Sequence, residues 1–340
     1  MSLQTTWFLL ITVLWAGFFL LEGFDFGVGM LTPFLGRDVR ERGRLKETTG
    51  PFWDGNEVWL VVAAAATFAA FPDWYATMFS AFYIPLFVVL VALILRATGT
   101  EYRDRRESER WRTGWDRVIA VCCLLVPLLI GVALGGLLVG LPIDSDKEFT
   151  GNFLDLVQPY ALLTGLAFVA LSLLQGTSFL RLRTTGELRR RASACGRRVS
   201  VIAAILVAAQ LIWTTVADPT ANVVPGPWAW LAITAAVATA LLEGGERHEG
   251  WAFVGGSATV VFTVANLFAT LYPNTMISST NSSYSLTTSD SSSSYTLTLM
   301  TIVAAIMLPV VLVYTAWNYW VFRQRVHPRP TSTPATAVDA

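Results

Sequence analysis

The feature that most constrains this chain is a series of apolar stretches joined by short polar connections. Each stretch can form a helix of roughly 20 residues, the length that crosses the hydrocarbon core of a bilayer. Only 14% of the residues are charged, whereas a soluble domain carries about 25%. The sequence therefore predicts an all-α polytopic membrane protein. The nine predicted helices are 7–33, 53–72, 75–97, 115–140, 157–180, 199–218, 227–244, 251–272 and 297–322.

The number of predicted helices constrains the topology. Nine is odd, so the two termini are expected on opposite sides of the membrane. Two four-helix bundles plus one extra helix would account for nine spans, although no internal repeat is visible in the sequence. Within the first span, Gly23 and Gly27 form a G-x-x-x-G pair, a spacing that lets two helices approach closely.

The orientation follows from the distribution of Lys and Arg, because basic residues concentrate in cytoplasmic loops. The connections that carry the basic residues are 34–52, 98–114, 181–198 and 245–250. The alternate connections are 141–156, 219–226 and 273–296. Together they hold one basic residue, Lys147. The N-terminus is therefore predicted outside and the C-terminus in the cytoplasm.

Two segments differ from the rest in composition. The connection 273–296 is rich in Ser, Thr and Asn and lacks Lys and Arg. Such a segment buries too little apolar surface to fold alone, so we expect an exposed extracytoplasmic loop or a cover on a partner. The tail 327–340 is predicted to be disordered in the cytoplasm, which leaves 1–326 as one membrane domain.

Acidic residues interrupt the first two apolar stretches. Glu22 and Asp25 lie three residues apart, as do Asp54 and Glu57, so each pair shares one helix face. An ionisable group inside a span costs on the order of 3 kcal/mol, and such groups normally face a packed interior or a water-filled path. The predicted orientation puts Asp25, Asp54 and Glu57 in the cytoplasmic third of the membrane.

Arg96 ends the third predicted span on the same side and completes a candidate charged site. A proton relay needs carboxylates that protons can reach from the cytoplasm, so Asp25, Asp54 and Glu57 are the candidate path residues. Arg96 is the candidate charge partner that would bias which acid stays ionised. Trp53, next to Asp54, is a candidate lining residue.

Each of these residues also has a simpler explanation. Asp54 and Glu57 are in the first two turns of a helix, where carboxylates are favoured by unpaired N–H groups and the helix dipole. Arg96 is placed where a long side chain can reach the membrane surface or pair with an acid. Trp53 is in a position typical of the interfacial aromatic belt.

The chain offers no obvious redox centre of its own. Haem iron takes His, Met, Cys or Tyr ligands, and both histidines, His248 and His327, fall outside the predicted spans. No carboxylate–His set or C-x-x-C spacing predicts a metal site. No G-x-x-x-x-G-K-[ST] loop predicts a nucleotide-driven pump. We expect no cofactor bound by this chain alone.

Several motifs together resemble one known family. EGFDFGVGML at 22–31 and WDGNEVWL at 53–60 closely resemble subunit II of the cytochrome bd-type quinol oxidases. The likeness continues through Phe71-Pro72, Tyr75, the Arg96 region, TGNF at 150–153, Gln175-Gly176, RTTGEL at 183–188 and YTAWNYW at 314–320. It covers nearly the whole chain, and the combination is specific.

The resemblance implies a haem-free subunit II paired with a subunit I that holds two b-type haems and one d-type haem. Such a complex lies in the bacterial cytoplasmic membrane, oxidises quinol on the outer side and reduces dioxygen to water. It takes its protons from the cytoplasm, which charges the membrane without pumping. The acid matching Asp54 would lie on the proton path, with Asp25 and Arg96 as further members.

The resemblance leaves two further partners open: small single-helix accessory subunits, and a quinone that some relatives hold in subunit II as a structural ligand. Lipid surrounds the chain, and no nucleic-acid partner is expected.

Two other functions would also account for acids inside the membrane. A stand-alone ion-coupled transporter would bind substrate or cation at Asp25 and Asp54 beside a broken helix; the odd helix count and the absence of visible inverted halves weigh against it. A pure assembly scaffold would use the acids only as caps and ion pairs.

Overall fold

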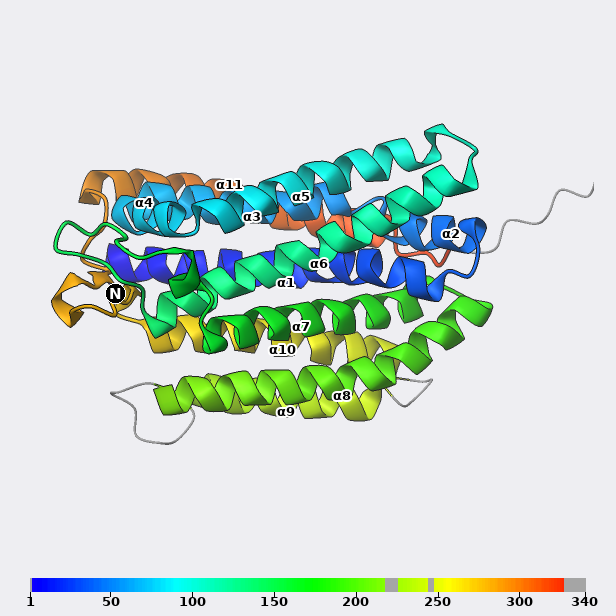
Figure 1. Cartoon of the computed structure of the whole chain (residues 1–340). Coiled ribbons are helices and arrows are strands. Elements are labelled where there is room, and N and C mark those ends of the chain that lie inside the picture. The colour runs from blue at the N-terminus through cyan, green and yellow to red at the C-terminus, as the bar shows by residue number, and fades with distance from the viewer. Residues whose placement is uncertain (1, 218–225, 244–247, 327–340) are drawn as a thin grey trace, which may run out of the picture.

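The structure is a computed structural model that describes residues 2–217, 226–243 and 248–326. Most helices run along one common axis, as expected for a membrane bundle (Figure 1). The α-helices are α1 (Leu3–Leu35), α2 (Val39–Thr49), α3 (Trp53–Ala70), α4 (Pro72–Ala81), α5 (Tyr83–Tyr102), α6 (Glu109–Val139), α7 (Pro159–Arg183), α8 (Gly186–Ala217), α9 (Pro227–Leu242), α10 (Glu249–Leu271) and α11 (Ser294–Val321). Three 3-10 turns and two short strands complete the described elements: η1 (Arg103–Arg105), η2 (Phe153–Leu156), η3 (Ser282–Tyr284), β1 (Asn274–Met276) and β2 (Leu286–Thr287).

Among the described residues, seven helices are long and apolar enough to cross a membrane: α1, α5, α6, α7, α8, α10 and α11. Two more occupy predicted stretches but are shorter. Helix α3 has 18 residues and a polar beginning, and α9 has 16 residues. The chain is an all-α multi-pass membrane protein.

The third predicted span, 75–97, is divided in the structure. Helix α4 ends at Ala81 and α5 begins at Tyr83. The cause is Pro85, whose nitrogen carries no hydrogen and cannot donate to the carbonyl of Ala81 four residues earlier. A proline in the first turn of the new helix is tolerated, because the N–H groups there have no partner within the helix.

Helix α1 lies in the middle of the molecule (Figure 1). It contacts α3 and α6 on one side and α7 and α10 on the other, while α8 and α9 pack beyond α7 and α10. Helix α11 touches α1 and α3 at the side of the bundle. The predicted close approach involves Gly27 of α1 and Gly176 of α7. A Cβ atom at Gly27 would lie 2.0 Å from the carbonyl oxygen of Ser172, so only glycine fits there.

The basic connections gather at one end of the bundle. Helix α2, which forms within the connection 34–52, lies at the same end as the turn between α5 and α6 (Figure 1). The N-terminus and the 273–296 connection lie at the opposite end. The charge asymmetry of the sequence thus corresponds to two different ends of the molecule.

The connection 273–296 was expected to be an exposed loop or a cover on a partner, and in the structure it packs on this chain. Strands β1 and β2 pair antiparallel, and Met276 and Leu286 are fully buried. The Ser278 hydroxyl donates to the Ile143 carbonyl at 3.0 Å, and Lys147 Nζ donates to the Ser285 carbonyl at 3.0 Å. The reason is that hydroxyl and ammonium groups satisfy the loop backbone, which lets a polar segment pack without a large core.

Some sequence predictions fall on residues that are not described. The disordered tail at 327–340 lies outside the described residues, and so do residues 219–225 and 245–247 of two predicted connections.

Candidate functional site

The acids of the first two spans meet Arg96 inside the bundle. Glu22 and Asp25 lie on the part of α1 that is enclosed by other helices, and both are buried, as is Arg96 of α5. Helix α3 begins at Trp53. Its first turns pack against α1 through the buried side chains of Asn56 and Trp59. Four helices, α1, α3, α5 and α11, contribute to the site.

The direct partner of Arg96 is Glu22. Arg96 Nη1 donates to Glu22 Oε2 at 2.8 Å, with the two side chains 4% and 0% exposed. The guanidinium also lies 4.8 Å from the centre of the Phe26 ring, a favourable cation–π distance. The sequence predicted Arg96 as a charge partner. In the structure it pairs with Glu22, which lies one turn deeper in α1 than the candidate path residue Asp25.

Asp25 is held by a neutral amide. Asn56 Nδ2 donates to Asp25 Oδ2 at 2.7 Å and to the Leu21 carbonyl at 3.1 Å. Tyr319, at the end of α11, donates its hydroxyl to Asn56 Oδ1 at 2.9 Å. The chain Tyr319–Asn56–Asp25 therefore links three helices and fixes the rotamer of the buried carboxyl group.

Glu57 and Trp53 lie at the edge of this cluster. Glu57 Oε2 is 3.7 Å from Arg96 Nη1, and its side chain is 24% exposed. The Trp53 ring centre is 5.8 Å from the Arg96 guanidinium carbon, and Trp53 lines a pocket beside Asp25. Both predicted residues are thus placed with Asp25 and Arg96.

Asp54 is not part of the cluster. It is exposed on the outer face of α3, and no ion pair joins it to another described residue. The cap residue of α3 is Phe52, and the described residues provide no side-chain hydrogen bond at that cap. The structure therefore separates Asp54 from Asp25, although the sequence grouped them.

The cluster has spare hydrogen-bonding capacity. Within the described part of the chain, Glu22 Oε1 and Asp25 Oδ1 are buried without a hydrogen-bond partner. Three carboxyl groups, those of Glu22, Asp25 and Glu57, face a single described guanidinium. Burial strongly disfavours uncompensated charge, so the arrangement suits a group of acids that shares protons.

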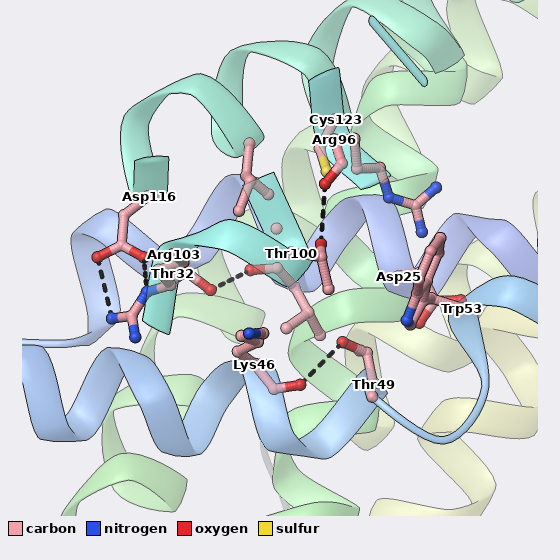
Figure 2. Close-up of a pocket in the computed structure, with 14 residues that line it drawn as sticks. Asp25, Thr32, Lys46, Thr49, Trp53, Arg96, Thr100, Arg103, Asp116 and Cys123 are labelled. Atoms are coloured by element: carbon pink, nitrogen blue, oxygen red, sulfur yellow. Dashed lines mark hydrogen bonds and ion pairs between the residues drawn. The ribbon is translucent and has the colours of Figure 1, made fainter. Parts of the chain in front are cut away.

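A pocket leads from the cluster toward the basic end of the bundle. Asp25 and Arg96 line its inner end, while Lys46, Thr49 and Gly50 line it on the side of α2. Figure 2 shows Lys46 and Thr49 on α2 below the pocket, with Asp25 and Trp53 together at one side.

The structure contains a second charged cluster that the sequence did not predict. Arg181 of α7 pairs with Glu243, which follows α9, and both are buried. Arg189 donates to Glu249 of α10 at 2.6 Å, and Arg325 donates to the same carboxylate at 3.2 Å. The feature of the sequence that could have indicated this cluster is Glu243, an acid near the end of the predicted span 227–244. These ion pairs join α7, α8, α9, α10 and the segment after α11.

The described residues contain no group of three potential metal ligands of the His, Cys, Asp or Glu type. The described histidine, His248, is exposed just before α10, and His327 lies outside the described residues. Asn56, Tyr319 and the pocket threonines were also missed, since neutral polar side chains carry little signal in a single sequence.

The sequence profile of the family described as "Cytochrome bd terminal oxidase subunit II" matches residues 3–322. The chain is 40% identical to cytochrome bd ubiquinol oxidase subunit 2 of Bacillus subtilis (strain 168), over 97% of this chain and 98% of that protein. It is 37% identical to cytochrome bd-I ubiquinol oxidase subunit 2 of Escherichia coli (strain K12), over 94% and 93%. A chain of the bd oxidase from Geobacillus thermodenitrificans has the same fold, with a TM-score of 0.74 over 95% of this chain and 99% of that chain at 18% identity.

Proposed function

This chain belongs to the family of subunit II of cytochrome bd terminal oxidases and is a subunit of a quinol oxidase, and from that premise we propose its part in the reaction. It supplies scaffold, a docking face for a haem-bearing subunit I, and part of the cytoplasmic proton path. Two b-type haems and one d-type haem in subunit I supply the electron transfer and oxygen chemistry. The complex oxidises quinol, reduces dioxygen to water and charges the bacterial cytoplasmic membrane without pumping.

The observation that carries the proposal is the buried group of acids around Arg96. A structural ion pair needs one acid, whereas here Glu22, Asp25 and Glu57 all face the same guanidinium. Asp25 keeps one oxygen without a hydrogen-bond partner among the described residues. A carboxyl group that is positioned but not fully satisfied can accept and release a proton, which is the chemistry a relay needs.

The docking face for subunit I is proposed on α3, α5 and α11. Only 6% of the α11 span is buried inside this chain. On α3, Asp54 shares a stripe with the exposed side chains Val58 and Val61, because positions i, i+4 and i+7 lie on one helix face. A carboxylate on such a face is disfavoured against lipid, so a protein partner accounts for it better. Asp54 would then continue the path at the interface.

We extend the topology to nine spans by counting α3 and α9. We also propose that eight of these helices form two groups of four, α1, α3, α5 and α6, and α7 to α10, with α11 as the extra helix. Contacts within each group support this arrangement, and the two groups pack together where α7 meets α1 and α6. The basic end of the bundle is proposed to face the cytoplasm, since Lys and Arg concentrate there. The N-terminus is then outside and the C-terminus inside.

The direct test is a pair of conservative variants in the assembled complex. Asp25→Asn and Asp54→Asn should slow quinol-driven oxygen consumption while the reduced-minus-oxidised spectrum keeps its b-type and d-type haem bands. Asp73→Asn is a matched control, because Asp73 is also exposed in the first turn of a helix, at the opposite end of the bundle. Unchanged turnover in both variants would contradict the proton-path role.

Two other results would point elsewhere. Loss of the haem bands in the Asp25 and Asp54 variants would make this chain an assembly scaffold without a relay role. A stable, colourless protein purified without any haem-bearing partner would favour the ion-coupled transporter. A quinone extracted from the purified chain would add a structural ligand to this subunit.

A further inference from the structure

We propose that water reaches Asp25 through a pocket inside this chain, between α2, α5 and α6, so that Asp25 has a cytoplasmic entrance of its own, separate from Asp54. This inference rests on the proposed function, because it names the route that supplies the same acid. The sequence and the family resemblance predicted that Asp25 and Asp54 belong to one path. In the structure Asp25 is buried inside the bundle, whereas Asp54 is exposed on α3.

The pocket connects the surface to the buried acid. Its lining includes Gly50, which is exposed, and Lys46 and Thr49, which are half-buried at the end of α2. Its inner end reaches Asp25 and Arg96. The exposed residue and the buried acid thus line one pocket, and Asp54 is not among the residues that line it.

The walls of the pocket provide hydroxyl groups along this route. Thr32, Thr49 and Thr100 each donate to a carbonyl of their own helix, at 2.8, 3.3 and 2.9 Å. A hydroxyl that donates once still has lone pairs that accept hydrogen bonds. Water in a protein interior needs such polar partners and room for itself. The three threonines line the pocket and are suited to hold water between the surface and Asp25.

Asp25 provides the second, independent observation. Its side chain is 3% exposed, and Oδ1 has no hydrogen-bond partner among the described residues, while Oδ2 accepts from Asn56. A buried carboxylate oxygen without a partner is costly unless water or a proton satisfies it. Because Asp25 lines the pocket, water there is the nearest source of both.

Ion pairs hold the outer walls of the pocket in place. Asp116 of α6 accepts from Arg103 Nε at 2.5 Å and pairs with Arg42 Nε of α2 at 2.9 Å. Lys46 pairs with Asp104 at 2.9 Å. These contacts join α2 to the connection between α5 and α6, so the mouth of the pocket has a defined shape. In each transfer a pocket water gives a proton to the Asp25 carboxylate and is reprotonated from the cytoplasm, so the net result is one proton moved from the cytoplasm to Asp25.

The first experiment blocks the pocket in the assembled oxidase. Thr100→Leu fills the space between the surface and Asp25, and we expect a loss of turnover that matches the loss in Asp25→Asn, with haem bands retained. Thr12→Leu is the matched control. Thr12 is also half-buried and donates to the carbonyl four residues earlier at 2.9 Å, but it does not line the pocket.

The second experiment measures water access directly and does not depend on turnover. In inside-out vesicles, Thr100→Cys should react with the membrane-impermeant, permanently charged reagent 2-(trimethylammonium)ethyl methanethiosulfonate, and peptide mass spectrometry should locate the adduct at position 100. Leu95→Cys, on the outward face of α5, should not react. The parent complex is labelled in parallel because Cys123 also lines the pocket.

The outcomes separate the route from the proposed function. If Asp25→Asn slows turnover while Thr100→Leu behaves like Thr12→Leu, the relay stands and this entrance is wrong. An unreactive Thr100→Cys also overturns the entrance. If Asp25→Asn has no effect on turnover while Asp54→Asn slows it, the proposed function stands and the pocket is overturned as a proton entrance. If neither variant slows turnover, the proposed function itself fails.

Discussion

Asn56 donates to Asp25 Oδ2 at 2.7 Å while it accepts the hydroxyl of Tyr319 at 2.9 Å. A neutral side chain therefore orients the buried acid, and the C-terminal helix orients that side chain. This relationship couples the proton-path candidate to α11, a helix that is otherwise almost entirely exposed on the surface of the chain.

Replacing Asn56 should disturb Asp25 more than replacing Tyr319. Asn56→Leu removes a hydrogen bond to a carboxylate, which is worth about 1.5–3 kcal/mol, whereas Tyr319→Phe removes a neutral hydrogen bond worth about 1 kcal/mol. We expect oxygen consumption to fall more in Asn56→Leu than in Tyr319→Phe, with haem content retained in both. Equal turnover in the two variants would mean that the amide does not position Asp25.

Removing Arg96 should destabilise the chain through Glu22. Arg96→Leu leaves a buried carboxylate without its partner, and breaking a buried ion pair in this way costs about 3–5 kcal/mol. The midpoint of thermal unfolding of the purified complex should drop clearly. The double variant Glu22→Leu/Arg96→Leu should recover much of the loss, because no buried charge is left unpaired between these two positions. A double variant as unstable as Arg96→Leu would argue against the pairing.

The positions of the helices could be predicted because a helix that lies in lipid must be apolar along its own length. The sequence signal of a span is local, so each predicted stretch coincides with a helix of the structure or, for 75–97, with parts of α4 and α5. The break at Phe82 also has a local cause, Pro85. The prediction missed it because the mean hydropathy of the whole stretch does not register a single proline.

The site could be predicted only in part, because its contacts are not local. The three-residue spacing correctly placed Glu22 and Asp25 on one buried face of α1. The choice of Glu22 as the partner of Arg96 depends on the relative depth of α1 and α5, which one sequence does not reveal. Asp54 and Glu57 have the same spacing, yet Asp54 points outward because α3 is covered by its neighbours on one side only. Tyr319 reaches the site from the last helix, and no pattern near Asp25 indicates it.

The contact between α2 and α8 should weaken in acid. Glu41 accepts from Arg191 Nη2 at 2.6 Å and from the Arg37 N–H at 2.8 Å. Burial alone would raise the pKa of Glu41, but these hydrogen bonds and the charge of Arg191 outweigh it and lower the pKa below its ordinary value of 4.5. Since the folded pKa is the lower one, the stabilisation is fully present above the ordinary pKa and is lost as the pH falls through the folded pKa.

Glu41→Gln therefore should lower the thermal midpoint of the complex at pH 7, and the difference from the unmodified complex should shrink as the pH falls below 4.5. Glu107→Gln serves as the control, since Glu107 is exposed in the connection between α5 and α6. A difference that stays constant with pH would show that the Glu41 charge does not contribute to this contact.

Adding one methyl group to Gly27 should separate α1 from α7. The new Cβ would lie 2.0 Å from the Ser172 carbonyl oxygen and 2.8 Å from the Gly176 Cα atom, and both obstacles are backbone that has no rotamer to change. We expect Gly27→Ala to lower the yield and thermal midpoint of the assembled oxidase. Gly114→Ala is the control, because nothing lies within 4 Å of a Cβ at that position in α6. There the gain in helix propensity of about 1 kcal/mol should leave stability equal or higher. If Gly27→Ala behaved like Gly114→Ala, the close crossing of α1 and α7 would not exist in the membrane.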